Sequence, residues 1–197
     1  QNHRHPGSQG PVAGQEGRAG QGQRDTGGGP AHGHDGRPEG HQGVGFTGPI
    51  SELATALAAT FPDPLDSVMF LNSGSEAIDG ALKLARRVTG RPGIVAFRGA
   101  FHGRTIGATS ITTSNLNYRT GYEPLLPGVH FAPYPSAYPE FGGDEEAASA
   151  AALAGLHAML GAVISPSMVA AVLIEPVQGE GGFSPAPASF LQALREL

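Results

Sequence analysis

The chain has 197 residues, a formal net charge of −5 and no cysteine. This acidic balance gives no electrostatic basis for binding nucleic acid or an anionic membrane, and the lack of cysteine excludes disulfides and thiolate metal sites. No apolar stretch reaches the roughly 20 residues that span a bilayer, and no apolar signal segment is present, so we expect a soluble, cytoplasmic protein.

Residues 1–45 differ in composition from the rest of the chain. They hold 14 of the 31 glycines and five of the eight histidines, and they contain no Leu, Ile, Met, Phe, Tyr or Trp. Such a segment cannot bury enough apolar surface to offset the entropy lost on ordering, which predicts a disordered, low-complexity tail. Its histidines have no carboxylate or cysteine at a recognised metal spacing, so a solvated tail is favoured over a metal site.

Helix and strand signals alternate in the predicted domain, residues 46–197. Apolar residues recur at helical spacing over 50–61 and again over 75–88, whereas "SVMFL" (67–71) and "GIVAF" (93–97) are apolar runs typical of buried strands. The order strand, helix, strand predicts a right-handed crossover and a parallel strand pair. The second helix is expected to bury one apolar face: Ala77, Ile78, Ala81, Leu82, Ala85 and Val88.

Three more elements complete the predicted domain. The Ala-rich run 147–160 indicates a helix, "VAAVLIE" (169–175) a third buried strand, and "PASFLQALREL" (187–197) another helix. The predicted fold class is therefore α/β, with a mostly parallel sheet and flanking helices.

The stretch "LNSGSEAIDG" lies at the expected carboxyl end of the first strand, where the next helix begins. Ligands gather at the carboxyl ends of parallel strands, and a helix start offers unpaired N–H groups that favour an anion. Gly74 lets the backbone approach a ligand, and the hydroxyls of Ser73 and Ser75 add donors. Ser73 and Glu76 also match a capping box, which explains both residues without a ligand. Both interpretations stay open for this stretch alone.

Two further loops follow predicted strands. "RGAFHGRT" places Phe101 and His102 beside glycines, and a flat aromatic side chain near a phosphate site suits a planar ring that carries a phosphate. "IEPVQGEGG" ends the third strand with Glu175 and Glu180, which could bind a cationic group. Taken singly, each of these residues also fits an ordinary loop anchor or a solvated acid. Together, the three strand ends indicate one common site.

These three motifs, in this order, resemble those of the class III aminotransferases, which use pyridoxal 5'-phosphate on a fold-type I scaffold. The likeness covers residues 46–197 and is nearest to the branch of 4-aminobutyrate and acetylornithine aminotransferases. It implies transfer of an amino group from an amine or ω-amino acid donor to a 2-oxo acid, in a homodimer. An aminomutase or decarboxylase of the same family, and a non-catalytic phosphate-binding remnant, stay open as alternatives.

The resemblance also implies a role for each motif residue. The residues that match the family's cofactor-binding positions are Ser73, Gly74, Ser75, Phe101 and His102. The residues that match positions near the substrate are Glu180, as an acid that pairs with an arginine, and Glu175.

The resemblance places no catalytic residue in this chain. The family's Schiff-base lysine, and the aspartate that pairs with the pyridine nitrogen, are expected beyond Leu197. The single lysine, Lys83, falls off the apolar face of its helix and is predicted to be solvated. We therefore expect residues 46–197 to be an incomplete cofactor-binding domain, inactive by itself, with a sheet edge left open.

Overall fold

The computed structural model describes residues 47–197 of the chain. The predicted low-complexity segment and its boundary at residue 45 lie outside these residues. Contacts divide the chain into two units, residues 1–52 and 53–197. The boundary falls within α1 (Gly48–Ala58), a helix with no buried residue, and the second unit contains every element that follows.

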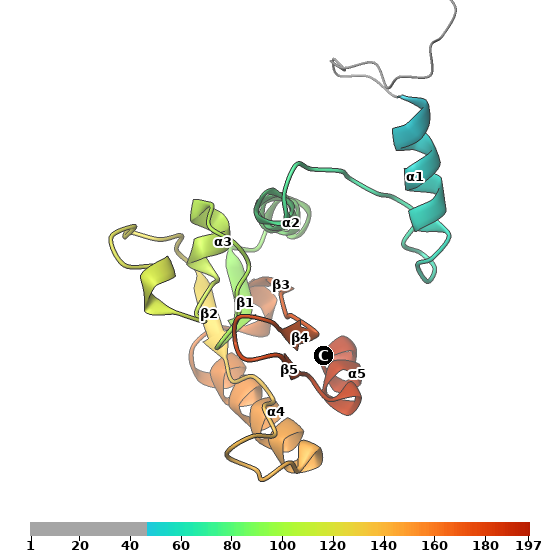
Figure 1. Ribbon diagram of the computed structural model, residues 1–197. Coiled ribbons are helices and arrows are strands. Elements are labelled where there is room, and N and C mark those ends of the chain that lie inside the picture. Colours follow the sequence, from blue (N-terminus) through green and yellow to red (C-terminus); the bar gives the residue numbers. More distant parts are fainter. Residues whose placement is uncertain (1–46) are drawn as a thin grey trace, which may run out of the picture. The chain divides into compact units, whose positions relative to one another are not determined.

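The second unit is built on a three-stranded parallel sheet with the strand order β2-β1-β3 (Figure 1). The central strand is β1 (Gly93–Phe97), flanked by β2 (Val129–Ala132) and β3 (Val169–Val172). Every residue of β1 is buried, because it has a strand on each side and helices over both faces. This arrangement confirms the predicted α/β fold with a parallel sheet and flanking helices.

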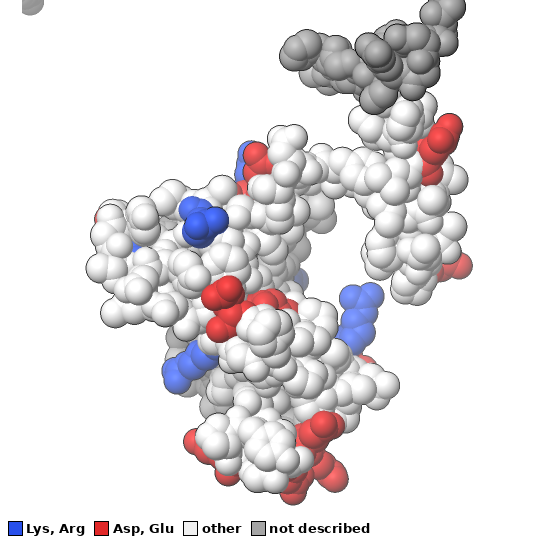
Figure 2. Space-filling view, viewed as in Figure 1, with Lys and Arg blue, Asp and Glu red and all other residues white. Residues whose placement is uncertain are grey.

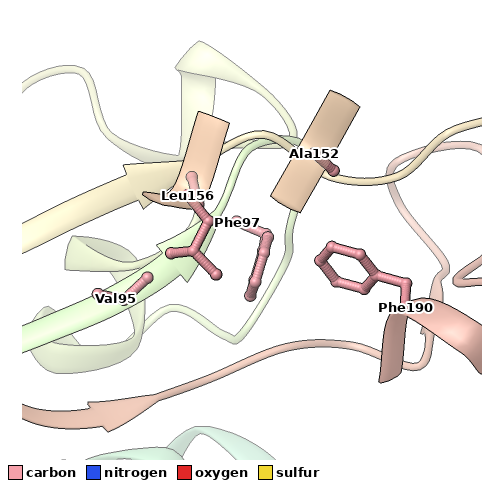
Figure 3. Close-up of a cluster of buried hydrophobic side chains, with 6 residues drawn as sticks. Val95, Phe97, Ala152, Leu156 and Phe190 are labelled. Carbon is pink, nitrogen blue, oxygen red and sulfur yellow. The ribbon is translucent and has the colours of Figure 1, made fainter. Parts of the chain in front are cut away.

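One face of the sheet packs against α4 (Glu145–Ala162) and α5 (Ala188–Glu196). Figure 3 shows Phe97 of β1 between Leu156 of α4 and Phe190 of α5. The two phenyl rings meet edge to face, with their centroids 5.9 Å apart, an arrangement that aromatic pairs prefer. This cluster anchors the last helix of the described chain to the central strand.

The opposite face of the sheet packs against α2 (Gly74–Thr89) and α3 (Ile106–Ser110), which lie on the other side of the sheet in Figure 1. Ile94 and Ala96 of β1 contact this layer, because successive residues of a strand point to opposite faces. The two buried layers hold β1 rigidly in the middle of the unit.

The predicted helices over 50–61, 75–88, 147–160 and 187–197 correspond to α1, α2, α4 and α5. The predicted strand over 93–97 is β1, so its bounds are confirmed. The other elements differ more. The predicted strand over 169–175 is the shorter β3, which is only partly buried because it lies at an edge of the described sheet. The sequence did not predict β2, because "VHFA" is too short a pattern to stand out.

The predicted strand over 67–71 is wrong, and so is the crossover that was built on it. Residues 65–71 have no regular secondary structure, and Met69 is 63% exposed. Instead of pairing with the sheet, Met69 and Leu71 lie over Gly80 of α2, where an added Cβ would come within 3.1 Å of both. A strand forms only where a neighbouring strand can accept and donate its backbone hydrogen bonds. Both sides of β1 are already paired, with β2 and β3, so no place beside β1 is left for residues 67–71.

The predicted apolar face of α2 is half right. Leu82 is buried, and Ile78 and Ala85 are half-buried. The other three residues of that face are exposed: Ala77, Ala81 and Val88. The helix is instead turned toward α3, where Gly107 approaches Asp79 so closely that a Cβ on the glycine would overlap the carboxylate. Close contact between α2 and α3 thus decided which side chains of α2 are covered.

Charged side chains are scattered over the face seen in Figure 2, with acidic ones gathered around the start of α4. Asp144 caps that helix, and Glu145 and Glu146 lie in its first turn, where the helix dipole favours acids. Within residues 47–197, no helix is long and apolar enough to cross a membrane.

Candidate functional site

The N-terminus of α2 is capped by Ser73. Its Oγ accepts the N–H of Glu76 at 3.2 Å, and Glu76 Oε2 accepts the N–H of Asn72 at 2.7 Å. The capping interpretation is therefore confirmed for Ser73, although the carboxylate closes the box one residue earlier than usual. No hydrogen bond to the N–H groups of Gly74 and Ser75 occurs within the described part of the chain. Capping and anion binding are thus compatible at this helix start.

The loop after β1 docks on the start of α2. Ser75 Oγ accepts the N–H of Arg104 at 3.2 Å, and the Thr105 hydroxyl donates to the Ser75 carbonyl at 3.5 Å. Between them, Gly103 has a φ of +131° and lies against Ser75 so closely that a Cβ would overlap its Oγ. Two motifs that are about 30 residues apart in the sequence therefore form one surface.

Glu175 joins the loop after β1 to the loop after β3. Its Oε1 accepts the N–H of Phe101 at 2.6 Å, and its Oε2 accepts the N–H of Gly179 at 3.3 Å. Nearby, the buried Gln178 donates from Nε2 to the carbonyl of Arg98 at 2.8 Å. The structure therefore brings together the three motifs that the sequence singled out. It also shows a contact of Gln178, a residue of the third motif to which the sequence assigned no role.

His102 is half-buried beneath this surface. Its backbone N–H donates to Thr112 Oγ1 at 2.9 Å. Its Nε2 is buried and has no hydrogen-bond partner among residues 47–197. Burial lowers the pKa of His102, an effect that the nearby Glu175 carboxylate partly opposes. The imidazole is therefore neutral at pH 7, with one buried ring nitrogen left for a ligand.

Phe101 and Glu180 meet through Tyr118, which the sequence analysis did not single out. The Phe101 and Tyr118 rings lie 4.9 Å apart between centroids, at 57° to each other. The Tyr118 hydroxyl donates to Glu180 Oε2 at 3.2 Å. A lone tyrosine outside any periodic apolar pattern gives no signal in the sequence, so only the tertiary contacts identify it.

Tyr134, just after β2, connects the carboxyl end of β2 to the same region. Its hydroxyl lies 2.9 Å from the Ser184 carbonyl and 3.2 Å from the Glu175 carbonyl. Burial, supported by the negative charge of Glu175, raises the pKa of Tyr134 to about 12, although a hydrogen bond at Gln178 opposes the shift. The carboxyl ends of all three strands are thus linked by side chains.

The raised pKa of Tyr134 predicts that the folded protein loses stability in strong alkali. An unfolded tyrosine loses its proton near pH 10, whereas folded Tyr134 keeps it to about pH 12. The folded state therefore holds the extra proton between these values, and the free energy of unfolding falls as pH rises from 10 to 12. In Tyr134→Phe we expect a shallower fall, measured by urea unfolding at several pH values. Tyr138→Phe, at a side chain that is 70% exposed, is the control and should keep the wild-type slope.

The side chains that meet here suit a phosphate group attached to a flat ring. The start of α2 offers N–H groups and the Ser75 hydroxyl, Phe101 offers a half-buried ring, and His102 offers an unpartnered ring nitrogen. Lys83, the single lysine of the chain, is exposed on α2, as predicted. The donors therefore fit the phosphate and the ring of pyridoxal phosphate, but they include no lysine.

Comparisons with known proteins agree with this chemistry. The family model described as Aminotransferase class-III matches residues 41–197. An acetylornithine aminotransferase from Methanopyrus kandleri is 40% identical over 152 residues, which are 77% of this chain and 33% of that protein. A probable 4-aminobutyrate aminotransferase from Bacillus subtilis is 38% identical over 143 residues, which are 72% of this chain and 33% of that protein.

A similar fold is present among solved structures. The crystal structure of a thermostable (S)-enantioselective omega-transaminase from Thermomicrobium roseum superimposes with a TM-score of 0.69 and 33% identity. The match covers 76% of this chain and 35% of that one. The chain thus spans about a third of the length of the proteins it matches.

Proposed function

Because this chain belongs to the class III aminotransferase family, whose cofactor is pyridoxal 5'-phosphate, we propose that it supplies the cofactor-binding part of a transaminase. The proposed reaction moves an amino group from an amine or ω-amino acid donor to a 2-oxo acid. The observation that carries the proposal is the docking of the Phe101–Thr105 loop on the N-terminus of α2 through Ser75. This contact favours a phosphate and an aromatic ring binding side by side.

The phosphate is proposed to bind at the start of α2. The N–H groups of Gly74 and Ser75, the Ser75 hydroxyl and the positive end of the helix dipole all favour a dianion there. Ser73 supports them by capping the helix. Phe101 is proposed to stack on the pyridine ring, beside the neutral imidazole of His102. When bound, pyridoxal phosphate supplies an electron-withdrawing ring that makes exchange of an amino group for a carbonyl oxygen feasible.

The two glutamates are proposed to act in different ways. Glu180 is exposed, and within residues 47–197 its carboxylate accepts one hydrogen bond, from the Tyr118 hydroxyl, so it is free to meet a cationic group of the substrate. Glu175 was also predicted to bind substrate. Both of its oxygens accept backbone N–H groups, which supports a role in holding the Phe101 loop at the site.

Several parts of the proposed enzyme lie outside the described residues. The lysine and the aspartate that the family's chemistry needs are still expected beyond Leu197, and residues 1–197 alone are expected to be inactive. A homodimer and a cytoplasmic location are likewise proposed from the family resemblance.

The proposal is tested with the complete gene product. After incubation with pyridoxal phosphate, it should transfer an amino group from 4-aminobutyrate or N-acetylornithine to 2-oxoglutarate, measured as glutamate formed. Cofactor binding without glutamate formation, but with rearranged or decarboxylated product, would favour an aminomutase or a decarboxylase. Failure to bind the cofactor at all would leave the phosphate-binding remnant as the better interpretation.

A further inference from the structure

The segment that carries Tyr118 is held firmly against the rest of the unit. Tyr118 ends the 3-10 helix η1 (Leu116–Tyr118), whose start is capped by the Asn115 side chain. The next residue, Arg119, donates from Nη1 to three carbonyls at the end of α3 and just after it: Thr109 at 3.2 Å, Ser110 at 3.2 Å and Thr112 at 2.7 Å. The guanidinium also lies 5.5 Å from the ring centroid of Phe131 in β2. Tyr118 therefore projects from a fixed backbone.

Among the described residues, the Tyr118 side chain contacts two different motifs of the candidate site. Its ring packs against Phe101, and its hydroxyl donates to the carboxylate of Glu180. These residues come from the loops after β1 and β3. The Glu175 carboxylate also connects these two loops, through hydrogen bonds to their backbone N–H groups. Tyr118 is therefore placed to hold both side chains at once.

We propose that Tyr118 is a positioning residue that holds the Glu180 carboxylate toward the substrate and supports the Phe101 ring against the cofactor. This inference rests on the proposed function for the roles of Glu180 and Phe101. Glu180 is exposed in a glycine-rich turn, where Gly182 has a φ of +111°. Without a donor its carboxylate samples several rotamers, so the hydroxyl lowers the entropy lost when a cationic substrate group binds.

The charges near the Tyr118 hydroxyl agree with this contact. The hydrogen bond from Tyr118 to Glu180, and the negative charge of Glu180, raise the pKa of Tyr118, whereas the cation of Arg104 opposes the shift. A phenol that stays protonated remains a donor to the carboxylate throughout the neutral range.

A double-mutant cycle in the complete, cofactor-loaded gene product tests the hydroxyl. Tyr118→Phe keeps the ring and removes the donor, so KM for the amino donor should rise about three- to tenfold, as expected for one solvent-exposed hydrogen bond that water weakens. The value of kcat and the affinity for pyridoxal phosphate should stay within about twofold of wild type. In a Glu180→Gln background the same substitution should change KM much less, because the charged acceptor is gone.

Tyr122→Phe is the matched control for this cycle, because Tyr122 is 58% exposed in the same loop region. It should leave all three quantities at the wild-type values. An equal effect of Tyr118→Phe in both backgrounds, or a wild-type KM in Tyr118→Phe, would overturn the proposal.

The ring contact is tested separately by Tyr118→Leu. Loss of the aromatic partner of Phe101 should weaken pyridoxal phosphate binding several-fold, measured by titrating the visible absorption of the cofactor, whereas Tyr118→Phe should not. Equal cofactor affinity in the Leu and Phe variants would show that the ring does not support Phe101.

A titration that needs no activity separates this proposal from the proposed function. The Tyr118 phenol is followed as the ultraviolet difference between wild type and Tyr118→Phe while the pH is raised, and the pair is then repeated in Glu180→Gln. Because Glu180 raises the pKa of Tyr118, the Gln variant should titrate at lower pH. That result in a protein without transaminase activity would support the contact between Tyr118 and Glu180 and refute the proposed function. If Tyr118 titrates at the same pH in Glu180→Gln as in wild type, the contact between Tyr118 and Glu180 is refuted, whatever the activity.

Discussion

Gly103→Ala is expected to lower the free energy of unfolding by about 2–4 kcal/mol and to weaken pyridoxal phosphate binding by about tenfold or more. Gly103 has a φ of +131°, and its added Cβ would overlap Ser75 Oγ and lie 2.8 Å from Ser75 Cβ. The loop would therefore have to move away from α2. That movement breaks the hydrogen bond from the Arg104 N–H to Ser75 and shifts Phe101 relative to the phosphate site.

Gly121→Ala is the control that measures the cost of backbone strain without a steric overlap. Gly121 also has a positive φ, +87°, but an added Cβ there would meet no atom within 4 Å. It should lower the free energy of unfolding by only about 1–2 kcal/mol and leave cofactor affinity unchanged. Urea unfolding and spectrophotometric titration of the cofactor measure both effects in the complete gene product. If the two alanine variants behave alike, the contact between Gly103 and Ser75 does not position the loop.

Glu175→Ala is expected to have the second largest effect. It removes a charged acceptor from the N–H groups of Phe101 and Gly179. Hydrogen bonds to charged groups each contribute about 1.5–3 kcal/mol, so we expect the free energy of unfolding to fall by about 3 kcal/mol. Cofactor affinity should fall with it, because the Phe101 backbone loses its tie to the end of β3.

The same substitution should also change the pKa of His102. The Glu175 carboxylate raises the pKa of His102 against the larger lowering by burial. In Glu175→Ala that pKa should therefore fall further, which imidazole proton shifts followed by NMR as a function of pH would measure. Glu140→Ala, at an exposed glutamate, is the control for removing one negative charge. A His102 pKa that stays at its wild-type value in Glu175→Ala would contradict the arrangement described here.

The candidate site was largely readable from short motifs, because each motif is a local chemical signature. The Ser73 cap needs a hydroxyl just before a helix and a backbone N–H three residues later, and both are visible in the sequence. Phe101, His102, Glu175 and Glu180 stood out because they follow apolar runs and lie beside glycines. Their assigned roles are predictions that the variants above address.

Other parts of the site could not be found in this way. Tyr118 contacts Glu180 across 62 positions of the chain, and Gln178 contacts Arg98 across 80. Neither residue lies in a periodic pattern, and neither pairing follows from local propensity. The error over residues 67–71 has a related cause, because an apolar run indicates burial against something without saying whether the partner is a strand or a helix.

The sequence by itself determined the α/β class, four of the helices, the central strand and the three motifs, since periodicity, capping and turn chemistry act within a few residues. Only the tertiary structure decided that β2 and β3 flank β1, that Met69 and Leu71 lie against α2, and that Tyr118 joins Phe101 to Glu180. These features depend on which distant segments meet when the helices cover the two faces of the sheet. Such choices follow from the packing of the whole unit rather than from any one segment.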